Sequence, residues 1–129
     1  MKNDPLADVL GNIQNAERIG RISVQSKPSS KIIQRVLDLM KEHGYINTYE
    51  VTDNNKGGVI TVTLKGSINK CGVIKPRLST TKNSIEKFEE RFLPAKDFGI
   101  IIISTPKGIM THHDAKLQKT GGKLIAYCY

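Results

Sequence analysis

The chain has few cysteines, the residues that cross-link cysteine-rich proteins. Only two cysteines occur among its 129 residues, Cys71 and Cys128, and they do not form a C-x-x-C pair. Redox motifs and zinc ribbons need closely spaced cysteines, so the sequence excludes both. Two separate thiols fit a reducing compartment, where small buried or edge positions are their expected places.

Aromatic residues and long apolar runs are also scarce. Tryptophan is absent and aromatic residues make up 5% of the chain, so base stacking along single strands is not expected as the main binding mode. No apolar run approaches the roughly 18 residues of a membrane helix. The first residues, M-K-N-D-P-L-A-D, lack the apolar core of a signal peptide. The sequence therefore predicts a soluble cytoplasmic protein with no membrane partner.

Positive charge, by contrast, is plentiful. Lys and Arg number 20 against 12 Asp and Glu, which gives a formal net charge of +8. Such an excess favours binding of a polyanion, although charge in a small domain can also serve solubility alone. Residues 1–66 hold 9 basic and 7 acidic residues, whereas residues 67–129 hold 11 and 5. The second half is therefore the better candidate for the binding surface.

The first half predicts an α-β-α-β-β unit. Asp4 and Pro5 are a helix-start signal, and the first helix is expected to run to about Glu17. A short strand, a second amphipathic helix ending at Gly44 and two further strands follow, with D-N-N-K-G-G as the turn between the last two. Two helices are expected to pack on the resulting three-stranded sheet.

The second half is expected to be rich in strands, with short helices. Asn83 with Glu86 resembles a capping box for a helix to about Phe92, and 98–103 reads as a strand buried on both faces. Thr111 with Asp114 is expected to open a short helix, which Thr120, Gly121 and Gly122 end before a terminal strand. The fold class is α+β, with two small domains predicted at 1–66 and 67–129.

The stretch from Phe98 to Leu117 carries the main candidate site. A turn after a buried strand, leading into a helix start, presents backbone N–H groups suited to a phosphate or a base edge. Ser104 and Thr105 add hydroxyls, Lys107 adds a mobile cation, and Gly108 would let another backbone approach closely. The alternative is that these residues simply make a good turn.

Two further basic sets are candidates for phosphate contacts. Lys27, Ser29 and Lys31 surround the expected start of the second helix. The second set, in the first part of the C-terminal half, comprises Lys70, Lys75 and Arg77. Ordinary capping and solvated lysines are the alternatives at both places.

A catalytic interpretation is weak. His112, His113 and Asp114 near Ser104 suggest a hydrolase, but a histidine and an aspartate two residues apart on one helix point in different directions. No G-x-S-x-G motif surrounds Ser104. The cysteines and histidines lack the spacing of a zinc site. The sequence therefore predicts no enzyme, no metal, no cofactor and no small-molecule substrate.

Eight segments, in order along nearly the whole chain, resemble the family of ribosomal protein eight of the small subunit. They are D-P-L-A-D at 4–8, I-Q-N-A at 13–16, K-P-S-S-K at 27–31, H-G-Y-I at 43–46, I-N-K-C-G-V-I-K-P-R at 68–77, L-P-A-K-D-F-G-I at 93–100, S-T-P-K-G-I-M at 104–110 and T-G-G-K at 120–123. N-K-C-G and L-P-A-K-D-F-G-I are more similar to the archaeal and eukaryotic branch than to the bacterial one.

The resemblance implies a structural protein of the small ribosomal subunit. It would bind the central domain of the ribosomal RNA directly, help assembly and lie beside neighbouring small-subunit proteins. The family's main RNA contact corresponds to 104–108, where Pro106 replaces a residue that commonly carries a hydroxyl or is small. Gly121 and Gly122 join the expected RNA-contacting residues. A free RNA-binding regulator, for example of its own messenger, is the milder alternative.

Overall fold

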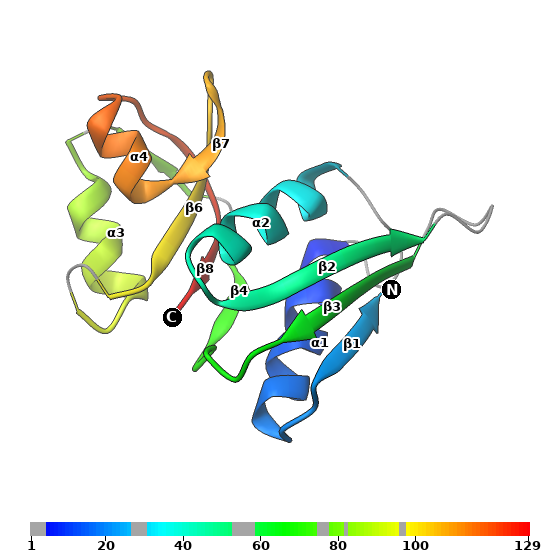
Figure 1. Cartoon of the computed structure of the whole chain (residues 1–129). Helices are drawn as coiled ribbons and strands as arrows, with labels where there is room; N and C mark the ends of the chain where they lie inside the picture. The colour runs from blue at the N-terminus through cyan, green and yellow to red at the C-terminus, as the bar shows by residue number, and fades with distance from the viewer. Residues whose placement is uncertain (1–4, 27–30, 53–58, 75–77, 82, 96–97) are drawn as a thin grey trace. The chain divides into compact units, whose positions relative to one another are not determined.

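The computed structural model describes residues 5–26, 31–52, 59–74, 78–81, 83–95 and 98–129 (Figure 1). The chain divides into two compact units, Met1–Gly72 and Val73–Tyr129. The sequence predicted two domains, 1–66 and 67–129. A domain is a part that folds independently, and compact units do not test this, so the two domains stay a prediction. No helix within the described ranges is long and apolar enough to cross a membrane.

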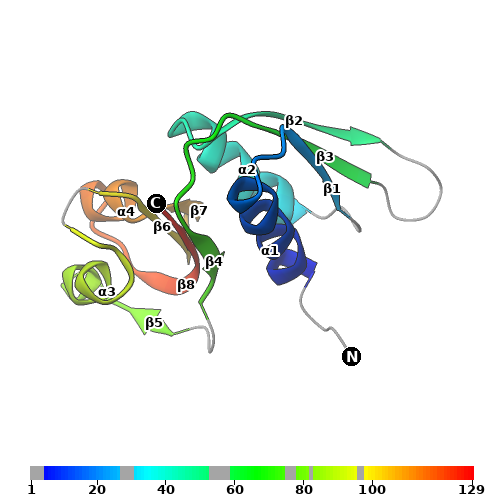
Figure 2. The same ribbon diagram turned by 90° about the horizontal axis from the view of Figure 1, so that it is seen from below.

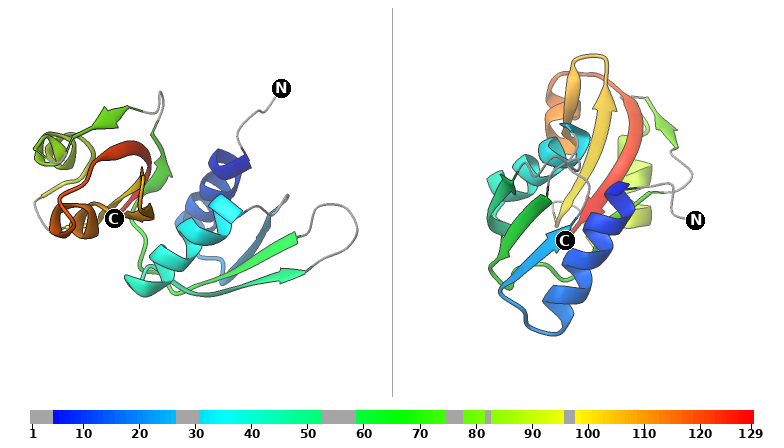
Figure 3. Two further views of the ribbon diagram at one scale, coloured as in Figure 1. Left: turned by 90° about the horizontal axis from the view of Figure 1, so that it is seen from above. Right: turned by 90° about the vertical axis from the view of Figure 1, so that its right-hand side faces the viewer.

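The first unit has the predicted α-β-α-β-β order. Its elements are α1 (Pro5–Arg18), β1 (Ser23–Ser26), α2 (Lys31–Glu42), β2 (Ile46–Thr52) and β3 (Val59–Leu64). The strands form an antiparallel sheet in the order β1-β3-β2, and both helices lie on one side of it (Figures 2 and 3). Alternate residues of β3, Ile60, Val62 and Leu64, are buried, as expected where one face of a sheet packs on helices.

Both helices of this unit end at a glycine in the left-handed region. Gly20 has φ 77° and Gly44 has φ 79°. After α1 the Gly20 N–H donates to the Glu17 carbonyl at 3.2 Å and the Arg21 N–H donates to the Ala16 carbonyl at 2.8 Å. This pair of bonds is a Schellman motif, which closes the helix and turns the chain into β1. The predicted helix end at Gly44 is confirmed.

The second unit is rich in strands with short helices, as predicted. Its sheet runs in the order β4-β8-β6-β7, with β5 pairing to β8. The elements are β4 (Cys71–Val73), at the division between the units, β5 (Ser79–Thr80), α3 (Ile85–Phe92), β6 (Ile100–Thr105), β7 (Gly108–Thr111), α4 (His112–Leu117) and β8 (Gly122–Cys128). Ile101 and Ile103 of β6 and Leu124 of β8 pack with Ile85 of α3 and Ala115 of α4.

The apolar run of β6 forms the rigid centre of this unit. Ile100, Ile101, Ile102 and Ile103 are all at most 2% exposed, so the strand is buried on both faces, as its sequence predicted. Neighbouring strands pair with it on both sides, β7 on one and β8 on the other. The end of β6 is therefore a fixed support for the turn that follows.

Strand β7 was not expected. The sequence predicted a turn that leads straight into a helix, and that is wrong because residues 108–111 first pair back along β6. A four-residue strand is too short to show an alternating pattern. The helix cap itself is confirmed, since the Asp114 N–H donates to Thr111 Oγ1 at 3.3 Å. Strand β7 thus separates the turn from helix α4, so the N–H groups at the start of α4 are not part of the turn.

The capping box predicted from Asn83 and Glu86 is also wrong. Helix α3 has Ser84 at its N-cap, and no side-chain cap bond is formed there. Ser84 Oγ instead accepts from the Thr81 N–H at 3.1 Å. A local turn between β5 and α3 uses the hydroxyl that would otherwise cap the helix.

Candidate nucleic-acid interface

The turn between β6 and β7 is closed from within by Thr105. Ser104 pairs with Ile109 and Thr105 with Gly108 in the hairpin register. The Thr105 hydroxyl donates to the Gly108 carbonyl at 2.8 Å and accepts from the Lys107 N–H at 3.1 Å. The residue is 8% exposed. Its hydroxyl therefore serves mainly to hold the turn.

Four residues of this turn face outward. Ser104, Pro106, Lys107 and Gly108 are all exposed, in contrast to Thr105. Gly108 has φ 122°, and apart from its own chain neighbours no heavy atom of the described residues lies within 4 Å of the place its Cβ would take. The backbone requires glycine here, and the space beside it is open. A ligand could approach the main chain closely between an exposed hydroxyl and an exposed cation.

A polar groove lies beside the hairpin in the second unit. It has a volume of about 570 Å³ and is lined by Ser79, Thr80, Thr81, Lys119, Thr120, Gly121, Gly122 and Lys123. Among the residues that the structure describes, the lining carries four hydroxyls and two ammonium groups and no carboxylate. Such a lining suits phosphate and sugar oxygens, which accept hydrogen bonds and attract cations.

Two glycines join the groove to the hairpin through main-chain packing. A Cβ on Gly121 would collide with the carbonyl oxygen of Thr80, and one on Gly122 with the carbonyl oxygen of Ser104. In the β6–β8 register Ser104 pairs with Lys123. Groove and hairpin are therefore one continuous surface, which we call the hydroxyl–lysine surface. It consists of Ser79, Thr80, Thr81, Ser104, Thr105, Lys107, Gly108, Lys119, Thr120, Gly121, Gly122 and Lys123.

This surface brings together half of the twelve residues predicted from the sequence. Lys31, the first residue of α2, and Lys70 are exposed in the first unit. Lys27, Ser29, Lys75 and Arg77 lie outside the described residues, as does the Asp4 cap. Sequence reasoning missed Lys119, Lys123 and the hydroxyls of 79–81. The run K-T-G-G-K at 119–123, two lysines around a hydroxyl and two glycines, could have revealed the lysines.

His112, the possible base of the hydrolase interpretation, is part of the core. It is fully buried, and its Nδ1 accepts from the Ile101 N–H at 3.0 Å. Its Nε2 lies 3.7 Å from Glu89 Oε2, and Lys116 forms an ion pair with Glu89 Oε1. Because Nδ1 is an acceptor, the proton of a neutral ring is on Nε2, facing the carboxylate. The ring therefore bonds the backbone of β6 at Ile101, three residues before Ser104, and interacts with Glu89 in the core.

Both cysteines are buried, as expected, and neither forms a disulfide bond within the described residues. The Cys71 thiol donates to the Leu10 carbonyl at 3.4 Å. Burial, and then the charge of Glu17, raise the pKa of this thiol to about 12, so it stays protonated near neutral pH. The described part of the chain contains no group of three or more side chains able to hold a metal ion.

Together these features define a class: a small basic α+β protein whose second unit presents hydroxyls, lysines and open backbone on a rigid sheet. The model of the family Ribosomal protein S8 matches residues 4–129. The small ribosomal subunit protein uS8 of Picrophilus torridus is 50% identical over 129 residues, which cover 100% of both chains. This chain belongs to the ribosomal protein S8 family.

Membership of this family confirms the main functional expectations. The chain is a component of the small ribosomal subunit and not an enzyme, and it works on the ribosome in the cytoplasm. The relative is archaeal, which is consistent with the resemblance of two segments of this chain to the archaeal and eukaryotic branch.

Proposed function

We propose that the chain binds the central domain of small-subunit ribosomal RNA directly, through the hydroxyl–lysine surface, and thereby helps the subunit assemble. The observation that carries the proposal is the continuity of the β6–β7 turn with the adjacent groove, joined where Gly122 packs on the Ser104 carbonyl. A rigid sheet holds both parts, so little ordering is required when RNA binds.

The chemistry of this surface favours RNA over DNA. A-form RNA presents a shallow groove of 2′-hydroxyls and phosphates, whereas the base edges of its deep groove are hard to reach. Serine and threonine hydroxyls both donate and accept, so they match a 2′-hydroxyl. Lys107, Lys119 and Lys123 supply the cations for phosphates. Contacts to shape and backbone should therefore dominate the binding.

The remaining predicted residues extend the proposal. Lys31 and Lys70, both exposed in the first unit, are proposed to contact further phosphates. The same role is proposed for Lys27, Ser29, Lys75 and Arg77. Gly121 and Gly122 contribute main chain rather than side chains, because packing leaves no room for a Cβ. Neighbouring small-subunit proteins are the other proposed partners.

A salt titration of the full chain against a central-domain RNA fragment tests the proposal. The logarithm of the binding constant should fall linearly with the logarithm of salt concentration. Lys123→Ala should weaken binding and reduce the size of that slope by about one if Lys123 neutralises a phosphate. Lys87→Ala, an exposed lysine on α3 outside the groove, is the matched control. Equal effects of the two variants, or equal affinity for unrelated RNA, would refute the proposal.

A further inference from the structure

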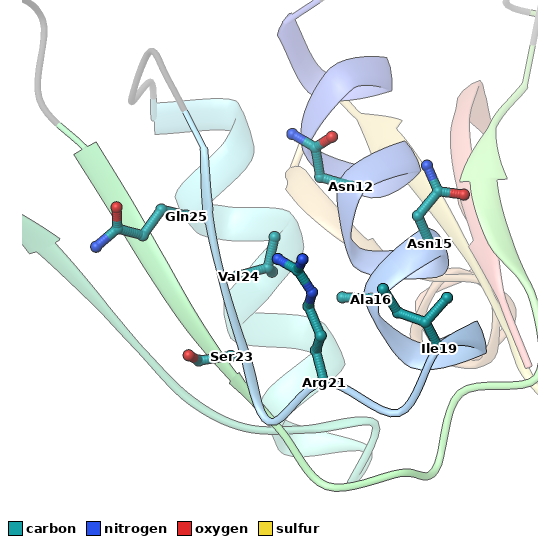
Figure 4. Close-up of a pocket in the computed structure, with 8 residues that line it drawn as sticks. All are labelled: Asn12, Asn15, Ala16, Ile19, Arg21, Ser23, Val24 and Gln25. Atoms are coloured by element: carbon teal, nitrogen blue, oxygen red, sulfur yellow. The ribbon is translucent and has the colours of Figure 1, made fainter.

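A second groove lies in the first unit, between α1 and β1 (Figure 4). It has a volume of about 610 Å³. From α1 it is lined by Asn12, Asn15 and Ala16, whose spacing places them along one side of the helix, and just after the helix by Ile19. From the following segment it is lined by Arg21, Ser23, Val24 and Gln25. The proposed RNA surface uses none of these residues.

The groove runs along the edge of β1, not across a face of the sheet. Consecutive strand residues point to opposite faces, so a groove that touches Ser23, Val24 and Gln25 in succession must follow the backbone. In the order β1-β3-β2, β1 is an end strand of its sheet, as far as the described strands go. Its second edge faces the groove.

The hydrogen-bond pattern shows which backbone groups this edge offers. The Ile22 carbonyl accepts from the Leu64 N–H at 2.7 Å, so Ile22 directs its polar backbone groups toward β3. In an antiparallel pair this direction alternates from residue to residue. Val24, opposite Val62 in the register, therefore also bonds toward β3. Ser23 and Gln25 direct their N–H and C=O groups into the groove.

The charge and the apolar rim of the groove distinguish a peptide from RNA. Among the described residues that line it, Arg21 alone is charged. Its side chain extends along β1 between that strand and α1 (Figure 4). One cation cannot neutralise a row of phosphates, but it can pair with one carboxylate. Ile19 lines the groove and is 63% exposed, and the neighbouring Ile22 is 77% exposed. Exposed apolar side chains beside unpaired strand groups fit an extended peptide.

We infer that this groove binds an extended segment of another small-subunit protein, which adds as a strand to the edge of β1 and places an acidic side chain against Arg21. Ser23 and Gln25 would supply the main-chain hydrogen bonds. The amides of Asn12 and Asn15 would line the opposite wall. The surface differs from the hydroxyl–lysine surface in its partner, which is protein rather than RNA.

The test uses the full chain and a blocked five-residue peptide of alternating threonine and valine with glutamate at its centre. Binding is followed by NMR shifts and hydrogen exchange of the Ser23 and Gln25 amides. The peptide should move both signals and slow their exchange. A peptide with lysine at the centre should bind at least fivefold more weakly, and Arg21→Glu should reverse this preference.

Matched variants separate main-chain from side-chain binding. Gln25→Pro removes the N–H that faces the groove and leaves the bonds to β3, so peptide binding should be lost while Gln25→Ala retains it. A peptide whose valines are N-methylated should bind the unaltered chain about tenfold more weakly, a result that does not depend on how a variant folds. Equal binding of the methylated peptide would overturn the inference. So would tighter binding of a single-stranded RNA oligonucleotide at the same amides, or self-association through them.

Discussion

The hydroxyl of Thr105 donates to the carbonyl of Gly108 across the β6–β7 turn, 2.8 Å away, while Ser104 beside it is exposed. The two hydroxyls therefore have separate tasks. Thr105→Val should cost about 1 to 2 kcal/mol of unfolding free energy, because it removes the hydroxyl that bonds the Lys107 N–H and the Gly108 carbonyl. Ser104→Ala should leave stability within about 0.5 kcal/mol.

For RNA affinity the order of the two variants should be reversed, with Ser104→Ala having the larger effect. Ser104→Ala is expected to weaken binding of the central-domain fragment with unchanged stability, which denaturant unfolding and a binding titration would measure together. A Ser104→Ala chain that binds as well as the unaltered one would remove Ser104 from the interface.

The close packing of Gly122 predicts intolerance of even one added carbon. Gly122→Ala should lower the unfolding free energy by about 1 to 3 kcal/mol, because its Cβ meets the rigid carbonyl of Ser104. Gly11→Ala in α1 is the control, since Gly11 is exposed with nothing within 4 Å of its Cβ position. That change should stabilise the helix by about 0.5 to 1 kcal/mol. Destabilisation of similar size in both would contradict the packing argument.

The buried Glu89 network predicts a sharp difference between neighbours on α3. Glu89 is 3% exposed and interacts with both His112 and Lys116. Glu89→Gln should cost about 1 to 3 kcal/mol, because a buried charged partner is removed. Glu90→Gln, on the exposed neighbour, should change stability by less than about 0.5 kcal/mol. Chemical denaturation near neutral pH would compare the two.

Cys71 predicts a loss of stability in alkali. Its pKa is raised to about 12 from a usual value of 9.0, so between these values the unfolded chain releases a proton that the folded chain keeps. The unfolding free energy should therefore fall as pH rises, by up to about 1.4 kcal/mol per pH unit. Cys71→Ala should lose this contribution.

Tyr49 also titrates in alkali. It is present in both the unaltered chain and the Cys71→Ala chain, so its contribution cancels when their unfolding free energies are compared. Burial, and then a 2.6 Å hydrogen bond to Asp38, raise the pKa of Tyr49 to about 12. Denaturant titrations at several pH values from 8 to 11 would give the two slopes. Parallel curves for the Cys71→Ala and unaltered chains would refute the role of the thiol.

Local signals in the sequence sufficed for much of this fold. Gly44 marks the end of α2 because the residue that closes a helix in this way is in the left-handed conformation, which glycine adopts without strain. The isoleucine run of 100–103 marks a doubly buried strand because it is apolar at successive positions. Thr111 caps α4 through a bond to a residue three positions on. Each of these features depends on neighbours along the chain.

The features that escaped prediction depend on residues distant in sequence. Strand β7 exists because it pairs with β6, and its four residues have no period of their own. The interruption of α4 was assigned to Thr120, Gly121 and Gly122, but Lys119 adopts the left-handed conformation, with φ 54°. The glycines are needed instead for contacts with β5 and β6. The sequence revealed only part of the candidate site. The residues of the hydroxyl turn are contiguous in sequence, whereas the groove is formed by two separate segments.

The main-chain contacts of Gly121 and Gly122 have a consequence for how this protein can diverge. Because carbonyl groups and Cα atoms set the shape of the surface, the lysines and the exposed hydroxyl of Ser104 can be exchanged one at a time without moving the others. Binding strength can therefore drift in small increments under a constant geometry, while the glycine pair itself has almost no acceptable replacements.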